Sequence, residues 1–291
     1  MSAKIHYRTT TIQGREIFYR EAGAPDAPVL LLLHGFPASS HMFRDLIPLL
    51  AGRYRVIAPD YPGFGYSAAP PVEEFDYTFD HLAAVLGEFT ERLGLDRFAL
   101  YVQDYGAPVG LRLALAHPER ITAIVTQNGN AYEEGLVEEA WADIRAYWAD
   151  PNPVTEAPVR ATQSAEGVRW QYIHGVTDQS LLNPDAWRHD IALLQRPGQD
   201  RVQLKLIGDY GSNVALYPDF HAYFRASQVP LLAAWGAHDQ IFGPAGATAF
   251  LRDLPEAEVH LLPAGHFALE THSAQIAALI DDFLTRRLPG A

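Results

Sequence analysis

The sequence predicts an α/β protein built on a doubly wound, mostly parallel sheet of eight strands. Short apolar runs alternate with longer segments in which apolar residues recur at helical spacing. The run Val29–Leu33 is apolar throughout, which is typical of a strand buried on both faces of a parallel sheet. The alternation stops near residue 130 and resumes near residue 225. This break predicts a helical segment inserted after the sixth strand.

Strands are expected where residues alternate between apolar and polar, or where a short run is apolar throughout. These segments are residues 5–11, 16–21, 29–33, 54–60, 98–102, 121–126, 229–235 and 258–262. The first two indicate a hairpin that turns at Gly14. Helices are expected where the spacing is about 3.6, at residues 43–50, 79–93 and 106–117, and in two later segments ending near residues 254 and 288.

Residues 131–224 show helical spacing in place of strand-like runs, most clearly at 133–148 and 184–194. Aromatic side chains are dense there, at Tyr132, Trp141, Tyr147, Trp148, Trp170, Tyr172, Trp187, Tyr210, Tyr217, Phe220, Tyr223 and Phe224. We expect residues 131–224 to form a cap domain over a core domain of residues 1–130 and 225–291. Such a cap would cover the carboxyl edge of the sheet, where α/β folds bind ligands. A small helical domain with its own aromatic core is an alternative compatible with this one.

Composition limits the classes of function. The chain of 291 residues carries a formal net charge of −13, which disfavours nucleic acid and anionic membranes as partners. It contains no cysteine, so disulfides, thiol catalysis and cysteine-bound metals are excluded. No run approaches the roughly 18 apolar residues of a membrane span, and Met1–His6 has no signal-peptide core. We expect a cytoplasmic protein with no cofactor and no metal.

The most informative residue is Asp104, within the segment Tyr101–Gly106. It lies between a predicted strand and a predicted helix and is followed closely by the small residues Gly106 and Ala107. A sharp strand-to-helix turn needs small neighbours because the two backbones come close together. The first N–H groups of a helix also favour a carboxylate. A carboxylate that only caps the helix is the alternative interpretation.

Two further residues follow predicted strands at the same edge of the sheet. His266 comes after the last strand, and Asp239 comes after the strand before it. The order Asp104, Asp239, His266 is that of nucleophile, acid and base in a hydrolase triad, with aspartate in place of serine. Asn128 follows another strand end, but an amide cannot supply a negative charge to the histidine, which favours Asp239.

Backbone N–H groups near Asp104 form the second part of the predicted site. Phe36, in the segment His34–Pro37, follows the third predicted strand, and Tyr105 follows Asp104. Their N–H groups are candidates for an oxyanion hole, although Gly and Pro also form plain turns. The glycine-rich segment 60–67 lacks the spacing of a phosphate-binding loop. We interpret it as a strand-end loop that packs near the site.

In this order, these motifs resemble the α/β-hydrolase superfamily, and within it the enzymes with an aspartate nucleophile, the epoxide hydrolases and haloalkane dehalogenases. The resemblance runs from about Ile5 to Leu288. It implies that Asp104 is the nucleophile, His266 the base and Asp239 the acid that orients the base.

The subclass is mixed. Phe36 is more like the residue of epoxide hydrolases at this position, whereas Val102-Gln103 is more like dehalogenases. Tyr105 stands where both groups usually carry Trp.

A carboxylate nucleophile predicts the reaction class. Its ordinary pKa of about 3.9 makes it an anion at neutral pH, so it needs no base to attack. Attack on an ester would give a reactive anhydride, whereas attack on an sp³ carbon gives a stable alkyl ester. The predicted partners are therefore a small apolar organic substrate and water, and the oligomeric state is left open between a monomer and a homodimer.

The leaving group decides the subclass. An opening epoxide needs hydroxyl donors, for which the resemblance favours Tyr210, with Tyr147 and Tyr172 as rivals for a second position. A departing halide needs N–H donors, for which Trp148 and Trp170 are candidates. An epoxide hydrolase is the leading prediction, a haloalkane or haloacid dehalogenase is the runner-up, and a non-catalytic binder with the same fold is the remaining alternative.

Overall fold

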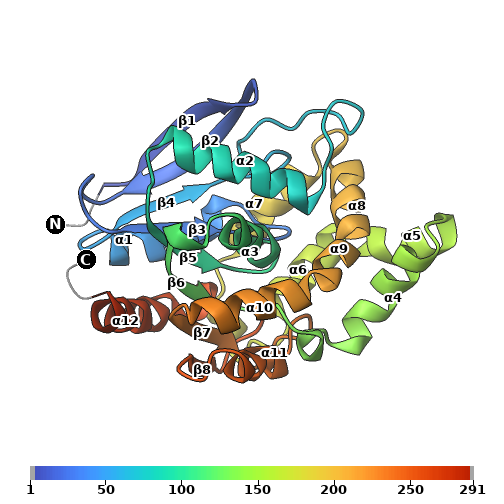
Figure 1. The fold of residues 1–291 in the computed structure, drawn as a ribbon. Coiled ribbons are helices and arrows are strands. Elements are labelled where there is room, and N and C mark those ends of the chain that lie inside the picture. The colour runs from blue at the N-terminus through green and yellow to red at the C-terminus, as the bar shows by residue number, and fades with distance from the viewer. Residues whose placement is uncertain (1–3, 289–291) are drawn as a thin grey trace.

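The computed structural model describes residues 4–288, and its centre is an eight-stranded sheet (Figure 1). The strands lie in the order β1-β2-β4-β3-β5-β6-β7-β8. β2 is antiparallel to both of its neighbours, and the later pairs are parallel. The strands are β1 His6–Ile12, β2 Arg15–Ala22, β3 Val29–Leu33, β4 Arg55–Pro59, β5 Phe98–Val102, β6 Ile121–Thr126, β7 Leu231–Gly236 and β8 Glu258–Leu262. The predicted sheet is confirmed, except that residues 1–3 and 289–291 of the predicted core lie outside the described range.

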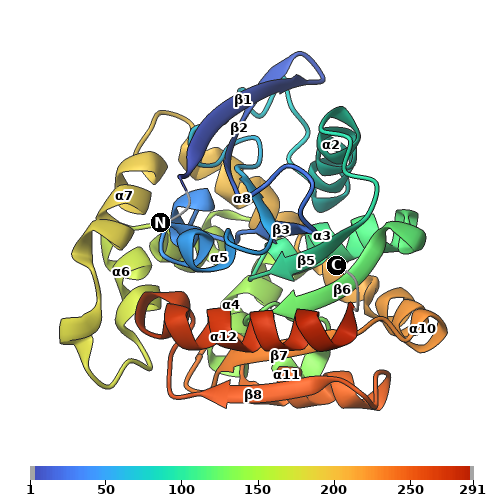
Figure 2. The ribbon, with the colours of Figure 1, turned by 90° about the vertical axis from the view of Figure 1, so that its left-hand side faces the viewer.

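Helices cover both faces of the sheet because its central strands are apolar on both faces (Figure 2). In β3, Leu31 and Leu33 belong to one apolar cluster, and Leu30 and Leu32 belong to the other, as the two-residue period of a strand requires. α2 and α3 complete the first cluster, whereas α1 and α12 complete the second. These helices are α1 Leu46–Leu50, α2 Phe79–Arg92, α3 Gly106–Ala116 and α12 Leu269–Arg287, with α11 Pro244–Ala249 beside β7.

Between β6 and β7 the chain forms a series of helices, of which α4, α5 and α8 lie to the right of the sheet in Figure 1. They are α4 Glu138–Ala149, α5 Pro153–Thr162, α6 Ala165–Ile173, α7 Pro184–Leu194, α8 Gln199–Asp209, α9 Gly211–Ala215 and α10 Tyr217–Ser227. α7 begins and ends where the spacing predicted. The predicted helix over 133–148 is divided, because Leu136 pairs with Phe242 through a backbone bridge before α4 begins.

The inserted helices share their apolar core with the sheet. Tyr210 and Phe220 belong to the same cluster as Tyr105 and Phe79, and Tyr172 belongs to the cluster on the other face. The aromatic rings of the insertion therefore pack against residues of the sheet side as well as against one another. The division into a core domain and a cap domain stays a prediction.

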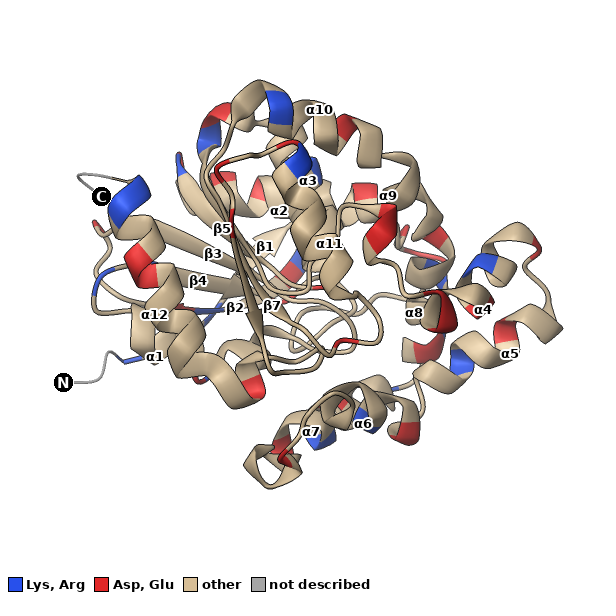
Figure 3. Cartoon of the chain, turned by 90° about the horizontal axis from the view of Figure 1, so that it is seen from below, with Lys and Arg blue, Asp and Glu red and all other residues tan. Residues whose placement is uncertain are grey.

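Acidic residues are spread over the inserted helices and over α12 (Figure 3). Between residues 4 and 288, no helix combines the length and the apolar character needed to cross a membrane.

Candidate active site

Asp104 lies on the tight turn between β5 and α3. Its φ of 48° is in the left-handed region, which non-glycine residues rarely adopt. This tight turn is possible because the two glycines in contact with it, Gly106 and Gly35, have no side chains. A Cβ at Gly106 would lie 2.2 Å from the carbonyl oxygen of Leu33, and one at Gly35 would lie 2.3 Å from the Asp104 carboxylate. The sharp turn predicted from the small residues is the turn observed.

Asp104, Asp239 and His266 come together at the carboxyl edge of the sheet. Nδ1 of His266 lies 2.8 Å from Oδ2 of Asp239, which is a hydrogen bond. Nε2 of the same ring lies 3.9 Å from Oδ2 of Asp104. The second distance is too long for a hydrogen bond, so His266 and Asp104 interact through charge. All three side chains are at least nine-tenths buried.

Asn128 fixes the orientation of Asp239. Its Nδ2 donates to Oδ2 of Asp239 at 2.7 Å, and its Oδ1 accepts from the N–H of Gly236 at 2.8 Å. The N–H of Ile241 donates to the other Asp239 oxygen at 2.7 Å. The sequence showed that Asn128 could not be the acid of the triad. It did not show that this amide would hold the acid in place.

Backbone N–H groups hold one oxygen of the Asp104 carboxylate. The N–H of Phe36 donates to Oδ1 at 2.6 Å, and the N–H of Tyr105 also stabilises the charged form. Burial nevertheless raises the pKa of Asp104 to about 6, although His266 and the two N–H groups oppose the shift. Above that pH the carboxylate is ionised, and Oδ2 has no hydrogen-bond partner among the described residues.

His266 is held between Asp239 and Gln103. Burial lowers the pKa of the imidazole, but the charge and hydrogen bond of Asp239, together with the charge of Asp104, outweigh burial and raise it. Nε2 of Gln103 lies 2.8 Å from Nε2 of His266, whereas Oε1 of Gln103 is buried without a partner. An amide can donate to a neutral ring nitrogen or accept from a protonated one. Gln103 therefore suits both charge states of His266, a role that sequence reasoning missed.

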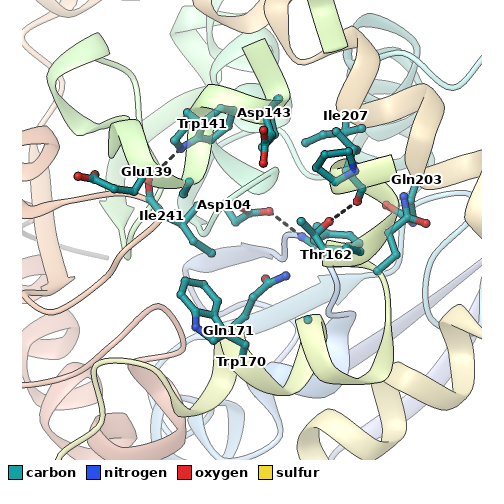
Figure 4. Close-up of a pocket in the computed structure, with 18 of the residues that line it drawn as sticks. Asp104, Glu139, Trp141, Asp143, Thr162, Trp170, Gln171, Gln203, Ile207 and Ile241 are labelled. Carbon is teal, nitrogen blue, oxygen red and sulfur yellow. Dashed lines mark hydrogen bonds between the residues drawn. The ribbon is translucent and has the colours of Figure 1, made fainter. Parts of the chain in front are cut away.

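A cavity of about 320 Å³ separates this sheet edge from the inserted helices (Figure 4). Asp104, Phe36 and Tyr105 line it on the sheet side, and α4, α5, α6 and α8 supply the opposite wall. Trp141 and Ile207 give that wall apolar surface. The carboxylate thus faces a largely apolar space of a size suited to a small molecule.

The predicted leaving-group donors occupy different places. Trp170 lines the cavity and is 39% exposed. Trp148 and Tyr147, by contrast, pack against α8, and the indole N–H of Trp148 donates to the carbonyl of Ile207 at 2.6 Å. Tyr172 donates its hydroxyl to Asp190 at 2.5 Å. Among these four residues, the indole of Trp170 is the group that the structure brings to the cavity.

Tyr210 lies behind Tyr105, with ring centroids 5.9 Å apart. Its hydroxyl is buried and has no hydrogen-bond partner within geometric limits, although Tyr217 is close enough to perturb it. Burial raises the pKa of Tyr210 well above its ordinary value, and the charges of Tyr217 and Asp104 raise it further. Tyr61, in the glycine-rich loop, is likewise unpaired, and both Tyr61 and Tyr105 have pKa values raised by burial and by Asp104. Three phenols therefore lie within electrostatic range of the carboxylate.

Cavity residues that the sequence did not indicate are polar or aromatic side chains on the inserted helices. Gln171 on α6 and Gln203 on α8 are 6% and 1% exposed, and Trp141 on α4 is 1% exposed. Helical spacing gives no signal that distinguishes a cavity-lining glutamine from a surface one. Within residues 4–288, no group of three or more His, Asp or Glu side chains is arranged to hold a metal ion.

Comparison with known sequences decides the family. Residues 28–273 match the sequence profile of the alpha/beta hydrolase fold. The chain belongs to the α/β-hydrolase family. The turn that carries Asp104 lies inside the matched segment, between β5 and α3.

Two relatives cover nearly the whole hydrolase chain. An uncharacterised hydrolase of Saccharomyces cerevisiae is 48% identical over 267 residues, which are 91% of each protein. A haloalkane dehalogenase of Bradyrhizobium diazoefficiens is 37% identical over 299 aligned positions, covering 94% of this chain and 92% of the relative. The protein is therefore a hydrolase with a haloalkane dehalogenase among its whole-length relatives.

Solved structures share the fold. The Cfl2 protein of Burkholderia cenocepacia superposes with a TM-score of 0.80 at 23% identity, covering 96% of this chain and 95% of Cfl2. The epoxide hydrolase CorEH superposes with a TM-score of 0.78 at 20% identity, covering 97% and 99% of the two chains. At these identities the likeness concerns the fold alone.

Proposed function

We propose that this hydrolase converts epoxides to diols through a covalent ester on Asp104. The observation that carries the proposal is an ionisable carboxylate on the turn between β5 and α3, within electrostatic range of the hydroxyls of Tyr61 and Tyr210, which have no hydrogen-bond partner among the described residues. The carboxylate selects the reaction class, and the hydroxyls select the leaving group.

In the first step, Oδ2 of Asp104 attacks a carbon of the epoxide, and the carbon–oxygen bond on that carbon breaks. Oδ2 is the attacking atom because Oδ1 accepts the N–H of Phe36. The departing alkoxide takes a proton from a phenol, for which Tyr210 is the donor that we propose. The product of this step is an alkyl ester of Asp104.

In the second step, His266 removes a proton from water, and the water oxygen adds to the ester carbonyl carbon of Asp104. The N–H groups of Phe36 and Tyr105 stabilise the resulting oxyanion, each by roughly 3 kcal/mol. The tetrahedral intermediate then collapses, and the departing alkoxide takes the proton of the added hydroxyl, which releases the diol and leaves the carboxylate. The proton on His266 returns to the phenolate of Tyr210, which restores both groups.

Ester formation itself prepares the base. In the free protein, the charge of Asp104 is one of the causes that raise the pKa of His266. The ester of Asp104 carries no charge, so this contribution disappears and the pKa of His266 falls. This fall favours the neutral imidazole at the step in which it must accept a proton, while Asp239 keeps the ring oriented.

The indoles of Trp141 and Trp148 are already hydrogen-bonded within the protein, which leaves Trp170 as the cavity indole that could bind a departing halide. The indole N–H of Trp141 donates to the carbonyl of Ile241 at 2.9 Å, and that of Trp148 donates to Ile207. An N–H that is already paired is a poor ligand for a departing halide. The hydroxyl of Tyr210 is unpaired and can serve an alkoxide.

A haloalkane dehalogenase is the second candidate, because Trp170 brings an indole to the cavity and because a whole-length relative carries that name. A haloacid dehalogenase is less well supported. The described residues that line the cavity include Glu139 and Asp143 but neither Lys nor Arg, so a carboxylate substrate would meet repulsion.

Trapping the ester tests the proposal. In the variant His266→Gln, the first step proceeds and the second stalls, so intact-protein mass spectrometry with an epoxide panel should show a stoichiometric adduct. Asp104→Ala should show none. Diol formation by the native protein, without halide release from matched haloalkanes, identifies the epoxide hydrolase.

Two other outcomes would favour the alternatives to an epoxide hydrolase. Halide release without diol formation would favour the dehalogenase. Binding of ligands by both native protein and His266→Ala, with no turnover of either substrate class and no adduct, would favour a non-catalytic binder. The cytoplasmic location and the oligomeric state, monomer or homodimer, remain predictions.

A further inference from the structure

The wall of the cavity opposite Asp104 contains two glutamines whose amides have no partner. Gln171, on α6, is 6% exposed, and its side-chain amide makes no hydrogen bond to any described residue. Figure 4 shows its amide pointing toward the middle of the cavity. Gln203, on α8, is 1% exposed, and both polar atoms of its amide are buried without a partner. The amide of Gln171 is therefore open to the cavity, whereas the polar atoms of the Gln203 amide lie beneath its surface.

This arrangement is unfavourable unless a ligand completes it. A buried amide without hydrogen bonds loses the free energy of hydration and gains nothing in return. A wholly apolar substrate would displace water from Gln171 and leave its amide unpaired. A substrate with a hydrogen-bonding group at this wall would instead pair with the amide.

The charges around the wall indicate what kind of group fits. An amide offers both a donor and an acceptor and carries no net charge. The nearest charged lining residues, Glu139 and Asp143 on α4, are exposed and acidic, which disfavours an anion. A cation would leave the N–H donors of the amide without an acceptor. A neutral hydroxyl, which both donates and accepts, matches Gln171 best.

We propose that Gln171 is a specificity-determining residue that recognises a hydroxyl on the substrate. The substrate class is then a hydroxylated epoxide rather than a plain alkyl epoxide. The identity of the reacting end rests on the proposed function, whereas recognition of the hydroxyl does not. Apolar residues between the two ends, such as Trp141 and Ile207, contact the carbon chain.

Matched probes test the proposal. Epoxyheptane and its isostere epoxyhexanol differ only in a terminal methyl or hydroxyl group. The ratio of kcat/KM for the hydroxylated probe to that for the methyl probe should fall about tenfold in Gln171→Leu, the scale of one hydrogen bond. Gln199→Leu is the control, because Gln199 on α8 is also buried but does not line this cavity.

A length shift separates recognition from a structural effect. Gln171→Asn withdraws the amide by one methylene, so it should restore the preference with epoxyheptanol, which is one carbon longer than epoxyhexanol. A variant that had merely lost packing would not change its preferred chain length. An unchanged ratio in Gln171→Leu, with turnover of both probes, would overturn the proposal and leave the proposed function standing.

Equilibrium binding keeps the two proposals separate. Hexanediol and heptanol are isosteres that cannot react, and isothermal titration calorimetry measures their affinities. We expect hexanediol to bind more tightly to the native protein, and this preference to be lost in Gln171→Leu. The preference without turnover of any epoxide would contradict the proposed function alone. Equal loss of affinity for both alcohols in Gln171→Leu would overturn the recognition of the hydroxyl.

Discussion

The sheet edge and the inserted helices face the same cavity, but their polar groups are in opposite states. On the sheet edge, Asp239, His266 and Asn128 are buried and hydrogen-bonded to one another or to the backbone. In the inserted segment, Gln203 and Tyr210 are equally buried and have unpaired polar atoms. Pairing is therefore more complete in the group around Asp239 than in the inserted segment, although Oε1 of Gln103 on the sheet edge is also unpaired.

The difference separates two tasks. Groups that are paired before substrate arrives are fixed in orientation, which is what a proton relay requires. Groups that are unpaired before substrate arrives gain hydrogen bonds only when it binds, so they discriminate among substrates. The proposed function accordingly assigns the chemistry to the sheet edge, and the proposed recognition of a hydroxyl assigns substrate selection to the helices. Four substitutions test this contrast.

Removal of a paired amide should have the largest effect. Asn128→Ala deletes the hydrogen bonds to Asp239 and Gly236 and places alanine at a φ of 51°. We expect the free energy of unfolding to fall by about 3 kcal/mol, measured by urea denaturation. Asn183→Ala, which removes a single cap at α7, is the control and should cost about 1 kcal/mol. Equal losses would contradict a special role for Asn128.

Neutralising the nucleophile should stabilise the protein in a pH-dependent way. Because burial raises the pKa of Asp104 to about 6, the folded protein binds more protons than the unfolded chain between about pH 4 and 6. Its stability therefore falls as pH rises through that window. Asp104→Asn should be more stable than the native protein by up to about 3 kcal/mol at pH 8, with little difference at pH 4.

Denaturation of both proteins across this pH range measures the effect, and a pH-independent difference would contradict the assignment. The same ionisation predicts that kcat/KM of the native protein falls below about pH 6, as the nucleophile becomes protonated.

Removal of the phenol hydroxyl should affect turnover more than stability. Tyr210→Phe removes a hydroxyl that has no partner, so the free energy of unfolding should change by less than about 0.5 kcal/mol. Loss of the proton donor should lower kcat for epoxides about a hundredfold. Tyr172→Phe is the opposite case, because it removes a hydroxyl paired with Asp190 and should cost stability without lowering turnover. Unchanged epoxide turnover in Tyr210→Phe would reject it as the donor.

Removal of an unpaired amide should have the smallest effect and the opposite sign to Asn128→Ala. Gln203→Leu deletes two unpaired polar atoms and should raise the free energy of unfolding by about 1 kcal/mol. Gln127→Leu on the sheet edge deletes an amide that donates to Asn128 and to the carbonyl of His266, and it should lower stability. Thermal denaturation of both variants compares them, and a loss of stability in each would remove the contrast.

The same contrast explains how far the sequence could predict the site. Asp104, Asp239 and His266 each follow a strand, and parallel strands end at one edge of the sheet, so their meeting follows from topology. The N–H group of Phe36 was predictable for the same reason. Sheet order and the positions of most helices followed from apolar periodicity.

The helical wall was not predictable in this way. Helical spacing identifies a buried face but not which helices that face will meet, so Gln171 and Gln203 carried no signal. Tyr147 and Trp148 were chosen from composition and resemblance, whereas the structure turns both toward α8. The pairing of Leu136 with Phe242 also depends on residues distant in sequence, which is why the predicted helix over 133–148 is divided.

The insertion leaves and rejoins the sheet at adjacent positions, because β6 and β7 pair directly through Ile124–Leu231 and neighbouring residues. The pairing of β6 with β7 therefore does not fix the length of the insertion. Because the two ends of the insertion are already held together, lengthening it costs little conformational entropy. The segment is exchangeable, provided that a replacement supplies the apolar face that packs on Tyr105 and Phe79. Replacing these helices with those of a relative is thus a route to new substrate ranges that leaves the sheet and the residues at its edge unchanged.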